Sequence, residues 1–374
     1  MYFSRDVLEP ANPTLADAVS HREPGRRHRI FVVVDSGVAD TRPRFAAEFA
    51  EYAEAHRDRL ELAAAPEVVA GGERIKSDSS LLTHLLTRFR EHALDRQSCV
   101  MIVGGGAVQD TAGYAAAIAH RGLRVVRVPT TVEAQNDSGV GVKNGMNALG
   151  AKNFVGTFSP PFAVVNDSSF LRTLPMRERV AGIAEAVKVA LIRDAVFFEW
   201  LEAHADDLAA FAPDVVEEMV RRSAELHLAH IAGSGDPFEF GNAKPLDYGH
   251  WLAHQLEIMT GYELRHGEAV AIGIAADARY ACEIGMLEAS PVQRICTLLE
   301  RCGLTLRHDA LSARDSSGRL EVLHGLREFR EHLGGEMSIT LLRAIGAAVD
   351  VHEIDEAVMA HAIGWLEARR RAAA

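Results

Sequence analysis

Residues 98–122 read SCVMIVGGGAVQDTAGYAAAIAHRG, and this stretch decides the fold class. Its apolar run at 99–103 predicts a buried strand, the glycines at 104–106 predict a tight turn, and a helical pattern begins near Asp110. Glycines at such a turn let backbone N–H groups approach a phosphate, which the helix N-terminus also favours. The alternative is a tight turn without a ligand, because the spacing is GGGxxxD and not GxGxxG.

The neighbouring segments extend this strand–helix alternation. RIFVVVDSGV at 29–38, LELAAAPEVVA at 60–70 and LRVVRVPTT at 123–131 predict further strands separated by helical patterns. We therefore expect a parallel, Rossmann-like sheet wound by helices. Asp35 ends the first of these strands, where it is placed either to hydrogen-bond a ribose or adenine edge or to cap a helix.

The hydrophobic pattern of the sequence changes after about Phe170. Strand-like runs vanish, and long amphipathic helical patterns dominate. The sequence thus predicts an α/β nucleotide-binding domain over residues 1–170 and an all-α domain over residues 171–374.

Composition narrows the function class. The chain has 374 residues, 48% of them hydrophobic, and a net charge of -12 without a block of Lys or Arg, which argues against nucleic acid as a partner. No apolar run reaches the roughly 18 residues that a membrane span needs, and the first residues lack the shape of a signal peptide. The four cysteines show no CxxC spacing, so we expect reduced core thiols in a cytoplasmic protein.

The segment 129–161, PTTVEAQNDSGVGVKNGMNALGAKNFVGTFSPP, is dense in polar residues and glycine. It is too polar for a core and too glycine-rich for a regular helix, so one interpretation is a solvated loop. However, Lys143 and Lys152 interleave with Asp137 and Asn153. Lysines for phosphate, with amides and carboxylates for hydroxyls, suit a phosphorylated polyol.

Residues 246–275, LDYGHWLAHQLEIMTGYELRHGEAVAIGIA, form a helical-looking run that contains three histidines. His250 and His254 are four residues apart and share a helix face, and His266 precedes the next apolar run. A histidine pair alone is more often an ordinary core or surface feature than a ligand set.

Residues 181–194, AGIAEAVKVALIRD, add a carboxylate, because Glu185 lies within an otherwise apolar helical run. An unpaired buried charge is costly, so Glu185 needs a partner, and Lys188 one turn away is the structural alternative. We interpret Glu185, His250 and His266 as ligands of one divalent metal. Such a set leaves coordination positions open, as in catalytic zinc sites, and the metal would polarise a hydroxyl or carbonyl oxygen.

Several motifs recur in a characteristic order: GGERIK, GGGAVQD, HRG, PTTVEAQNDSGVGVKNG, GAKNFVGTF, LPMRERVAGIAEAVK, DYGHWLAH and RHGEAVAIGI. Through them, from about Arg29 to Gly346, the chain resembles the sugar phosphate cyclases, whose best-known member is 3-dehydroquinate synthase. The resemblance implies an NAD-binding α/β domain and a helical domain. It also implies NAD and a divalent metal, zinc or cobalt, as cofactors, a phosphorylated sugar as substrate, and a homodimer.

The resemblance also implies roles for individual positions. The metal ligands again fall on Glu185, His250 and His266. The catalytic positions are Lys143, Lys188, Glu239 and His254. The substrate-binding positions are Asp137, Asn153, Arg121, Asp247 and Arg330, with Arg121 contributed across the dimer interface. The cofactor contacts fall on Asp35, Glu73, Lys76, Gly105, Gly106, Asp110, Thr130, Thr131, Lys152, Phe170 and Thr173, whereas a usual asparagine contact is Gly37 here.

Other positions depart from 3-dehydroquinate synthase, which binds its substrate carboxylate with a lysine and an arginine. Those two positions are Ala229 and Ala243 here, and a usual asparagine is Asp247. In the region of a later lysine, only Arg330 and His332 offer positive charge. A carboxylate beside an aspartate is repelled where it needs pairing, so we expect a substrate with a neutral head.

These departures bring the chain nearest to the C7-cyclitol synthases, such as 2-epi-5-epi-valiolone or 2-epi-valiolone synthase, which act on sedoheptulose 7-phosphate. The implied reaction is transient oxidation by NAD, phosphate elimination, re-reduction and intramolecular aldol closure. The alternatives are a 3-dehydroquinate synthase whose carboxylate site is rebuilt on Lys244, a metal-dependent alcohol dehydrogenase, and a non-catalytic descendant that only binds a nucleotide or a partner.

Overall fold

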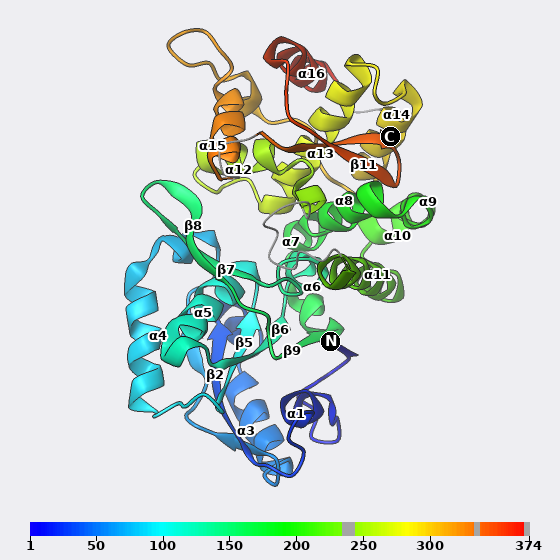
Figure 1. Cartoon of the computed structure of the whole chain (residues 1–374). Coiled ribbons are helices and arrows are strands. Elements are labelled where there is room, and N and C mark those ends of the chain that lie inside the picture. Colours follow the sequence, from blue (N-terminus) through cyan, green and yellow to red (C-terminus); the bar gives the residue numbers. More distant parts are fainter. Residues whose placement is uncertain (234–243, 333–336, 370–374) are drawn as a thin grey trace. The chain divides into compact units, whose positions relative to one another are not determined.

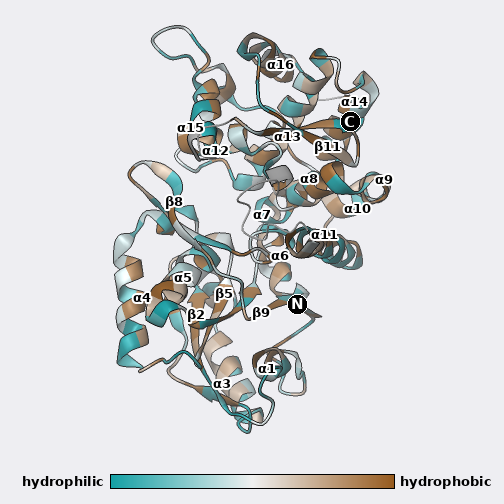
Figure 2. Ribbon diagram, viewed as in Figure 1, coloured by the Kyte–Doolittle hydropathy of each residue, from teal (hydrophilic) through white to brown (hydrophobic). Residues whose placement is uncertain are grey.

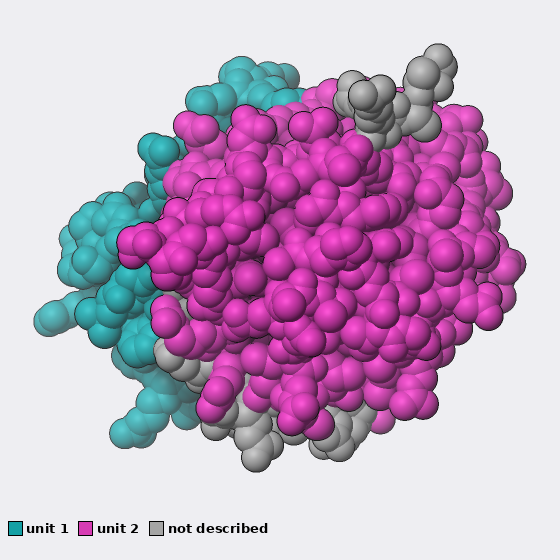
Figure 3. Space-filling view, turned by 90° about the horizontal axis from the view of Figure 1, so that it is seen from above, with its two compact units in different colours: residues 1–175 teal, residues 176–374 magenta. Residues whose placement is uncertain are grey.

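The structure is a computed structural model that describes residues 1–233, 244–332 and 337–369 (Figure 1). The chain divides into two compact units, residues 1–175 and residues 176–374 (Figure 3). The division falls a few residues after the predicted boundary at 170. We describe each unit by itself.

A parallel sheet forms the centre of the N-terminal unit. Its strand order is β1-β9-β6-β5-β2-β3, with β4 also paired to β2, and every pairing is parallel. The strands are β1 (Tyr2–Ser4), β2 (His28–Asp35), β3 (Leu60–Leu62), β4 (Glu67–Val69), β5 (Cys99–Gly104), β6 (Arg124–Pro129) and β9 (Ala163–Asp167). The predicted Rossmann-like class is thereby confirmed.

Helices cover both faces of this sheet. They are α1 (Thr14–Ser20), α2 (Ser36–Thr41), α3 (Phe45–Ala55), α4 (Ser79–Glu91), α5 (Gly106–Ile118) and α6 (Val132–Asn136), with 3-10 turns η1 (Glu73–Ser77), η2 (Ala119–Arg121) and η3 (Ser168–Thr173). Alternate residues of β2 serve two cores, because successive strand side chains point to opposite faces. Val32 packs with α1 and α3, whereas Val33 packs with α4 and α5. The apolar strands β2 and β5 stand out in brown in Figure 2.

The structure corrects two local expectations in this sheet. Residues 60–70 form two short strands, β3 and β4, instead of one. Pro66 lies between them, and a proline has no N–H for the ladder. The strand β9 was not predicted, because its run AVVND follows the polar segment directly and carries no glycine turn of its own.

The polar segment 129–161 is folded, so the expectation that it is too polar for a core is wrong. It contains α6 and an antiparallel hairpin of β7 (Lys143–Ala148) and β8 (Ala151–Phe158). Gln135, Asn136 and Asn144 are buried. The Gln135 amide donates to the carbonyl oxygens of Pro129 at 3.0 Å and Asp167 at 2.9 Å. Amide side chains can fill a core when the main chain satisfies them.

The C-terminal unit is helical, as predicted. It contains α7 (Met176–Ala181), α8 (Ile183–Arg193), α9 (Ala195–Ala203), α10 (Ala205–Ala209), α11 (Pro213–Gly233), α12 (His250–Met259), α13 (His266–Glu283), α14 (Ala289–Arg301), α15 (His324–His332) and α16 (Glu356–Ala368), with turns η4 (Lys244–Asp247), η5 (Asp309–Ser312) and η6 (Glu321–Leu323). Across the described ranges, no helix has both the length and the apolar character to cross a membrane.

Two details of this unit differ from the expectation. The helical-looking run 246–275 is two helices, because Gly261 and Tyr262 adopt positive φ values of 58° and 65° between α12 and α13. An antiparallel hairpin of β10 (Ile339–Ala344) and β11 (Ala347–Val351) is added to the helices. Its turn contacts α8, where Gly346 N donates to the Leu191 carbonyl oxygen at 2.7 Å.

Candidate metal and nucleotide sites

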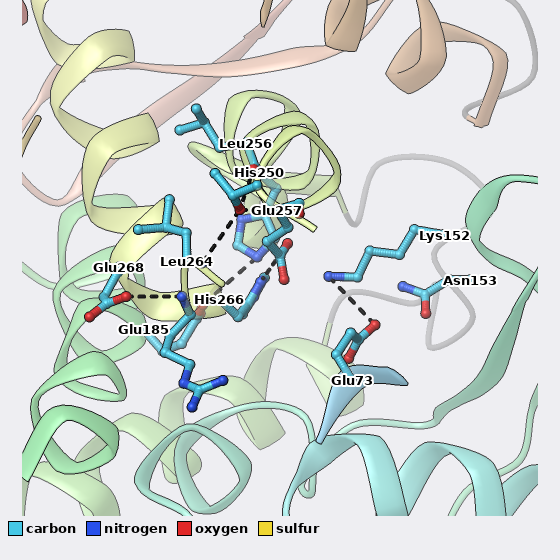
Figure 4. Close-up of polar contacts among 12 residues, drawn as sticks. Glu73, Lys152, Asn153, Glu185, His250, Leu256, Glu257, Leu264, His266 and Glu268 are labelled. Carbon is cyan, nitrogen blue, oxygen red and sulfur yellow. Dashed lines mark hydrogen bonds and ion pairs between the residues drawn. The ribbon is translucent and has the colours of Figure 1, made fainter. Parts of the chain in front are cut away.

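A buried glutamate and two histidines converge in the C-terminal unit (Figure 4). Glu185 Oε1 lies 3.4 Å from His266 Nε2 and 3.8 Å from His250 Nε2. All three ligand atoms lie within 4.8 Å of one another. Within the described ranges Glu185 Oε1 accepts no hydrogen bond, although the side chain is only 1% exposed. Ligands of a tetrahedral zinc with bonds of about 2.0–2.1 Å stand about 3.3 Å apart, so the set fits a metal.

The structural alternative for Glu185 is also present. Lys188 Nζ lies 2.5 Å from Glu185 Oε2, one turn along α8, and both side chains are buried. The ion pair engages one carboxylate oxygen and leaves the other directed at the imidazoles. The two interpretations of Glu185 are therefore compatible, because each uses a different oxygen.

His250 is held in the form that binds a metal. Its Nδ1 lies 3.1 Å from the carbonyl oxygen of Tyr248, which leaves Nε2 for the group around Glu185. Burial first, and then the nearby Lys188 and the other imidazoles, lower the pKa of His250 well below its usual value. The imidazole is therefore neutral, as metal ligation requires.

Glu257 is a member of this cluster that the sequence analysis missed. Its side chain is buried, and Oε2 lies 3.2 Å from His266 Nδ1, on the side of the ring away from Glu185. A carboxylate in this position fixes the orientation and tautomer of a metal-binding histidine. The signal was available, since Glu257 stands in the apolar run HQLEIM much as Glu185 stands in its own. With His254 and His266 it forms a second group of potential ligands.

Close helix packing places these side chains. A Cβ atom on Gly273 of α13 would lie 2.0 Å from the carbonyl oxygen of Gly249, which precedes α12. Asp277, also on α13 and fully buried, accepts hydrogen bonds from Gly249 N at 3.1 Å and Trp251 Nε1 at 2.9 Å. These residues flank His250, so Asp277 fixes the start of α12. Burial raises the pKa of Asp277 to about 7.

The other predicted residues of the C-terminal unit are spread over several elements. His254 lies one turn after His250, and its ring stacks on that of His266 with centroids 6.0 Å apart. Asp247 is half-buried in η4, whereas Ala229 on α11 and Arg330 on α15 are exposed. Glu239 and Ala243 lie outside the described residues.

The glycine loop lies at the carboxyl ends of β2, β5 and β6. Gly105 caps α5 and Gly106 begins it. A side chain would be crowded at both positions, because a Cβ atom on Gly105 would lie 3.0 Å from Thr131 Cγ2, and one on Gly106 would lie 2.8 Å from Ser138 Oγ. Main chain is thus exposed at a helix N-terminus, which suits a phosphate. Thr130 is buried beside this loop.

Asp35 caps a helix, as one of its two interpretations predicted, and its contact with a ribose or adenine stays a prediction. It ends β2, and its Oδ1 accepts a hydrogen bond from Gly37 N at 2.8 Å, so it caps α2. Burial raises the pKa of its carboxyl above the usual value. A Cβ atom on Gly71 would lie 2.4 Å from Asp35 Oδ1, so the carboxylate at the end of β2 packs directly against a glycine.

Five predicted residues form one polar cluster beside α5. Lys76 is buried, and its Nζ lies 2.6 Å from Asp110 Oδ2 and 3.8 Å from Glu73 Oε1. Its ammonium also hydrogen-bonds Asn153 Oδ1. Lys152 Nζ lies 3.9 Å from the same Glu73 oxygen (Figure 4). Asn153, predicted to bind substrate, is therefore joined to residues predicted to bind the cofactor.

Four further predicted residues of this unit have other surroundings. Phe170 is part of the sheet core under the Arg42 guanidinium, 4.9 Å from its ring centre, and Thr173 Oγ1 donates to the Phe170 carbonyl oxygen at 3.2 Å. Lys143 is exposed on β7. Arg121 follows the far end of α5, a helix of 13 residues and hence about 20 Å long, so the glycine loop and Arg121 lie at opposite ends.

Comparison with known proteins identifies this pairing of an α/β unit with a helical unit. The family model described as 3-dehydroquinate synthase N-terminal matches residues 67–181, and the one described as 3-dehydroquinate synthase C-terminal matches residues 182–322. A 3-dehydroquinate synthase from Xanthomonas campestris pv. campestris (strain 8004) is 36% identical over 352 residues, which cover 92% of this chain and 91% of the relative. The chain belongs to the 3-dehydroquinate synthase family.

Solved structures point to the wider group of sugar phosphate cyclases, as the motifs predicted. A 2-epi-5-epi-valiolone synthase from Streptomyces hygroscopicus subsp. jinggangensis 5008, with NAD+ and Zn2+ bound, is 27% identical with a TM-score of 0.85, covering 98% of this chain and 96% of that one. A 2-deoxy-scyllo-inosose synthase complexed with carbaglucose-6-phosphate, NAD+ and Co2+ is 24% identical with a TM-score of 0.78, covering 97% and 95%, and shows a shared fold.

Proposed function

We propose that this protein is an NAD- and metal-dependent sugar phosphate cyclase that converts sedoheptulose 7-phosphate to a C7 cyclitol with loss of phosphate. Family membership supports the reaction class. The likeness to a 2-epi-5-epi-valiolone synthase with NAD+ and Zn2+ bound supports the cofactors and the substrate class.

The observation that carries the substrate choice is the charge around the first histidine. Ala229 and Ala243 stand where 3-dehydroquinate synthase has a lysine and an arginine, and Asp247 stands three residues before His250. A substrate carboxylate at this wall would meet an anion and lack its two cations, which costs binding free energy. A heptulose with a neutral head avoids that cost.

The described side chains suit the two cofactors. Glu185, His250 and His266 would hold the divalent cation, which when bound polarises a substrate hydroxyl or carbonyl oxygen. The loop at Gly105 and Gly106 would bind the pyrophosphate of NAD, which accepts a hydride and later returns it, so that no net redox change remains.

The remaining residues act on protons and charge. The ammonium of Lys188 is buried beside Glu185, where it would stabilise negative charge that develops on a substrate oxygen. His254 would hold and release the proton of the oxidised hydroxyl, with Glu239 as its helper. Asp137, Asn153 and Lys143 would bind the hydroxyls and the oxyanion. Arg121 would reach the phosphate bound by the second subunit of a homodimer.

A second candidate is 3-dehydroquinate synthase itself. It is favoured by the name of the 36% identical relative from Xanthomonas campestris. It requires a carboxylate site built from other cations, for which Lys244 is the nearest replacement in the sequence.

Phosphate release distinguishes the candidates. The purified protein is incubated with NAD+ and Zn2+, and either sedoheptulose 7-phosphate or the heptulosonate 7-phosphate of 3-dehydroquinate synthase. We expect phosphate release from the first sugar without net accumulation of NADH, and none from Glu185→Ala. Release from the heptulosonate alone would establish the second candidate. Accumulation of NADH without phosphate release would indicate a metal-dependent alcohol dehydrogenase.

A further inference from the structure

Arg127 is a fully buried cation on an inner strand of the parallel sheet. It lies on β6, and its exposed fraction is 0%. Its guanidinium donates five hydrogen bonds. Nη1 donates to the carbonyl oxygens of Ser138 at 3.1 Å, Gly139 at 3.3 Å and Gly141 at 2.7 Å, and Nη2 donates to the Lys143 carbonyl oxygen at 3.0 Å and to Asn144 Oδ1 at 2.8 Å.

None of these five acceptors is a carboxylate. Burying a charge costs several kcal/mol, and hydrogen bonds from a charged donor, at about 1.5–3 kcal/mol each, offset much of that cost. Burial lowers the pKa of Arg127 to about 10, so the guanidinium is still charged at neutral pH. The charge of the Asp110 carboxylate also favours the charged guanidinium, but every hydrogen-bond acceptor belongs to residues 138–144, so the hydrogen bonding of this group depends on that one segment.

The segment 138–144 joins α6 to β7, contains Lys143, a predicted catalytic residue, and follows Asp137, which is predicted to bind substrate. Asp137 precedes it, and its carbonyl oxygen accepts hydrogen bonds from Val140 N at 2.9 Å and Gly141 N at 3.2 Å. Lys143 is fixed by its own main-chain bond to Arg127, which leaves its side chain exposed. The guanidinium therefore holds the backbone of Lys143 directly and that of Asp137 through the hydrogen bonds from Val140 and Gly141.

A second contact fastens the same segment to the helix of the glycine loop. Gly113 lies on α5 two turns after Gly106, and a Cβ atom there would fall 2.0 Å from Asn144 Oδ1, the oxygen that accepts from Arg127. The Asn144 side chain is thus wedged between α5 and the guanidinium.

We propose that Arg127 is a positioning residue that fixes the main chain of residues 138–144 and thereby the places of Asp137 and Lys143. The part played in substrate binding rests on the proposed function, whereas the fixing of the segment does not. A lysine cannot replace the arginine, because the two terminal nitrogens of the guanidinium reach two separate groups of acceptors, which a single ammonium cannot span. The Nε atom of Arg127 makes no hydrogen bond among the described residues.

Hydrogen–deuterium exchange of the full-length protein with NAD+ and Zn2+ tests the proposal. We expect Arg127→Lys to raise the exchange rate of amides in 138–144 at least tenfold, while the amides of β5 exchange as before. The matched control is Arg124→Gln, three residues earlier on β6, which removes an ion pair of 2.6 Å with Glu23 and leaves the segment alone. We expect kcat for phosphate release to fall at least tenfold in Arg127→Lys, with the Kd for NAD+ unchanged.

Gly113→Ala provides a variant that keeps the arginine. We expect it to raise exchange in the same segment by displacing Asn144, without loss of the sheet. Unchanged exchange at 138–144 in Arg127→Lys would overturn the proposal. An equal increase in exchange throughout the sheet in Arg127→Lys and Gly113→Ala would also overturn it. If the unaltered protein releases no phosphate from any heptulose phosphate, the proposed function fails, and the exchange result still decides whether Arg127 fixes the segment.

Discussion

Gly267 and Ala181 lie so close that a Cβ atom on Gly267 would fall 1.9 Å from the carbonyl oxygen of Ala181. Ala181 ends α7 just before α8, and Gly267 is the second residue of α13. This approach brings the first residue of α13, His266, to Glu185 on α8, at 3.4 Å. The glycine of the HGE motif is therefore a condition of the ligand geometry.

Replacement of this glycine should cost metal affinity. We predict that Gly267→Ala forces α13 away from Ala181 and weakens zinc binding at least tenfold, as measured by chelator competition. Gly364→Ala is the control, because α16 leaves that position free of contacts within 4 Å. It should keep the zinc affinity and gain about 0.5–1 kcal/mol of helix propensity. Equal zinc affinity in both variants would refute the packing argument.

Glu257 should affect the metal through His266. We predict that Glu257→Gln weakens zinc binding by about 10- to 100-fold without unfolding the protein, because the imidazole loses the carboxylate that orients it. Glu178→Gln, which removes an exposed ion pair of 2.6 Å with Arg265, should leave the affinity unchanged. A stoichiometry of two zinc ions in the unaltered protein would instead assign Glu257 to a second site with His254.

The sequence predicted what depends on periodicity and on motifs. The strand–glycine–helix unit around Gly105, the parallel sheet and the helical second unit follow from local patterns. The convergence of Glu185 with His250 and His266 was inferred from buried charge and family motifs, and the structure brings the three together. Their role as ligands stays a prediction.

The contacts that could not be predicted from the sequence depend on long-range packing. Nothing local to Arg127 shows that its acceptors lie 11 to 17 residues later in the chain. The expectation that polar residues of segment 129–161 stay out of the core was wrong for Gln135, because main-chain carbonyl oxygens of Pro129 and Asp167 accept hydrogen bonds from its amide. Asp277 was not singled out from the sequence, because only the packing of α13 against the start of α12 shows that it is fully buried there.

Asp277 should make stability depend on pH. Its pKa is raised to about 7, so the folded state binds this proton more tightly than the unfolded state does. Stability from this group is therefore present at low pH and is lost as pH rises from about 4 to about 7, by about 1.4 kcal/mol per pH unit.

The test of this prediction is urea unfolding at several pH values. Asp277→Asn should lower stability at pH 5, since one of two hydrogen bonds is lost, but should flatten the decline between about pH 5 and pH 7. Asp315→Asn is the control, because the pKa of Asp315 is lowered to about 2 and that group does not titrate in this range. An unchanged slope in Asp277→Asn would contradict the assignment.

Restoring the missing charge should shift substrate preference. We predict that Ala229→Lys combined with Asp247→Asn raises kcat/KM for the heptulosonate relative to sedoheptulose 7-phosphate at least tenfold, equivalent to about 1.4 kcal/mol. Leu228→Lys adds the same charge on another face of α11 and should not change the ratio. Competition between the two sugars for phosphate release measures it, and an unaltered ratio in the double variant would remove the charge argument.

The most direct test of the metal assignment is X-ray absorption spectroscopy of the protein loaded with one equivalent of Zn2+. Coordination by Glu185, His250 and His266 predicts two imidazole nitrogens and carboxylate oxygen at about 2.0–2.2 Å, and the loss of this signal in Glu185→Ala. A sulfur neighbour at about 2.3 Å, or a spectrum without imidazole scattering, would contradict it.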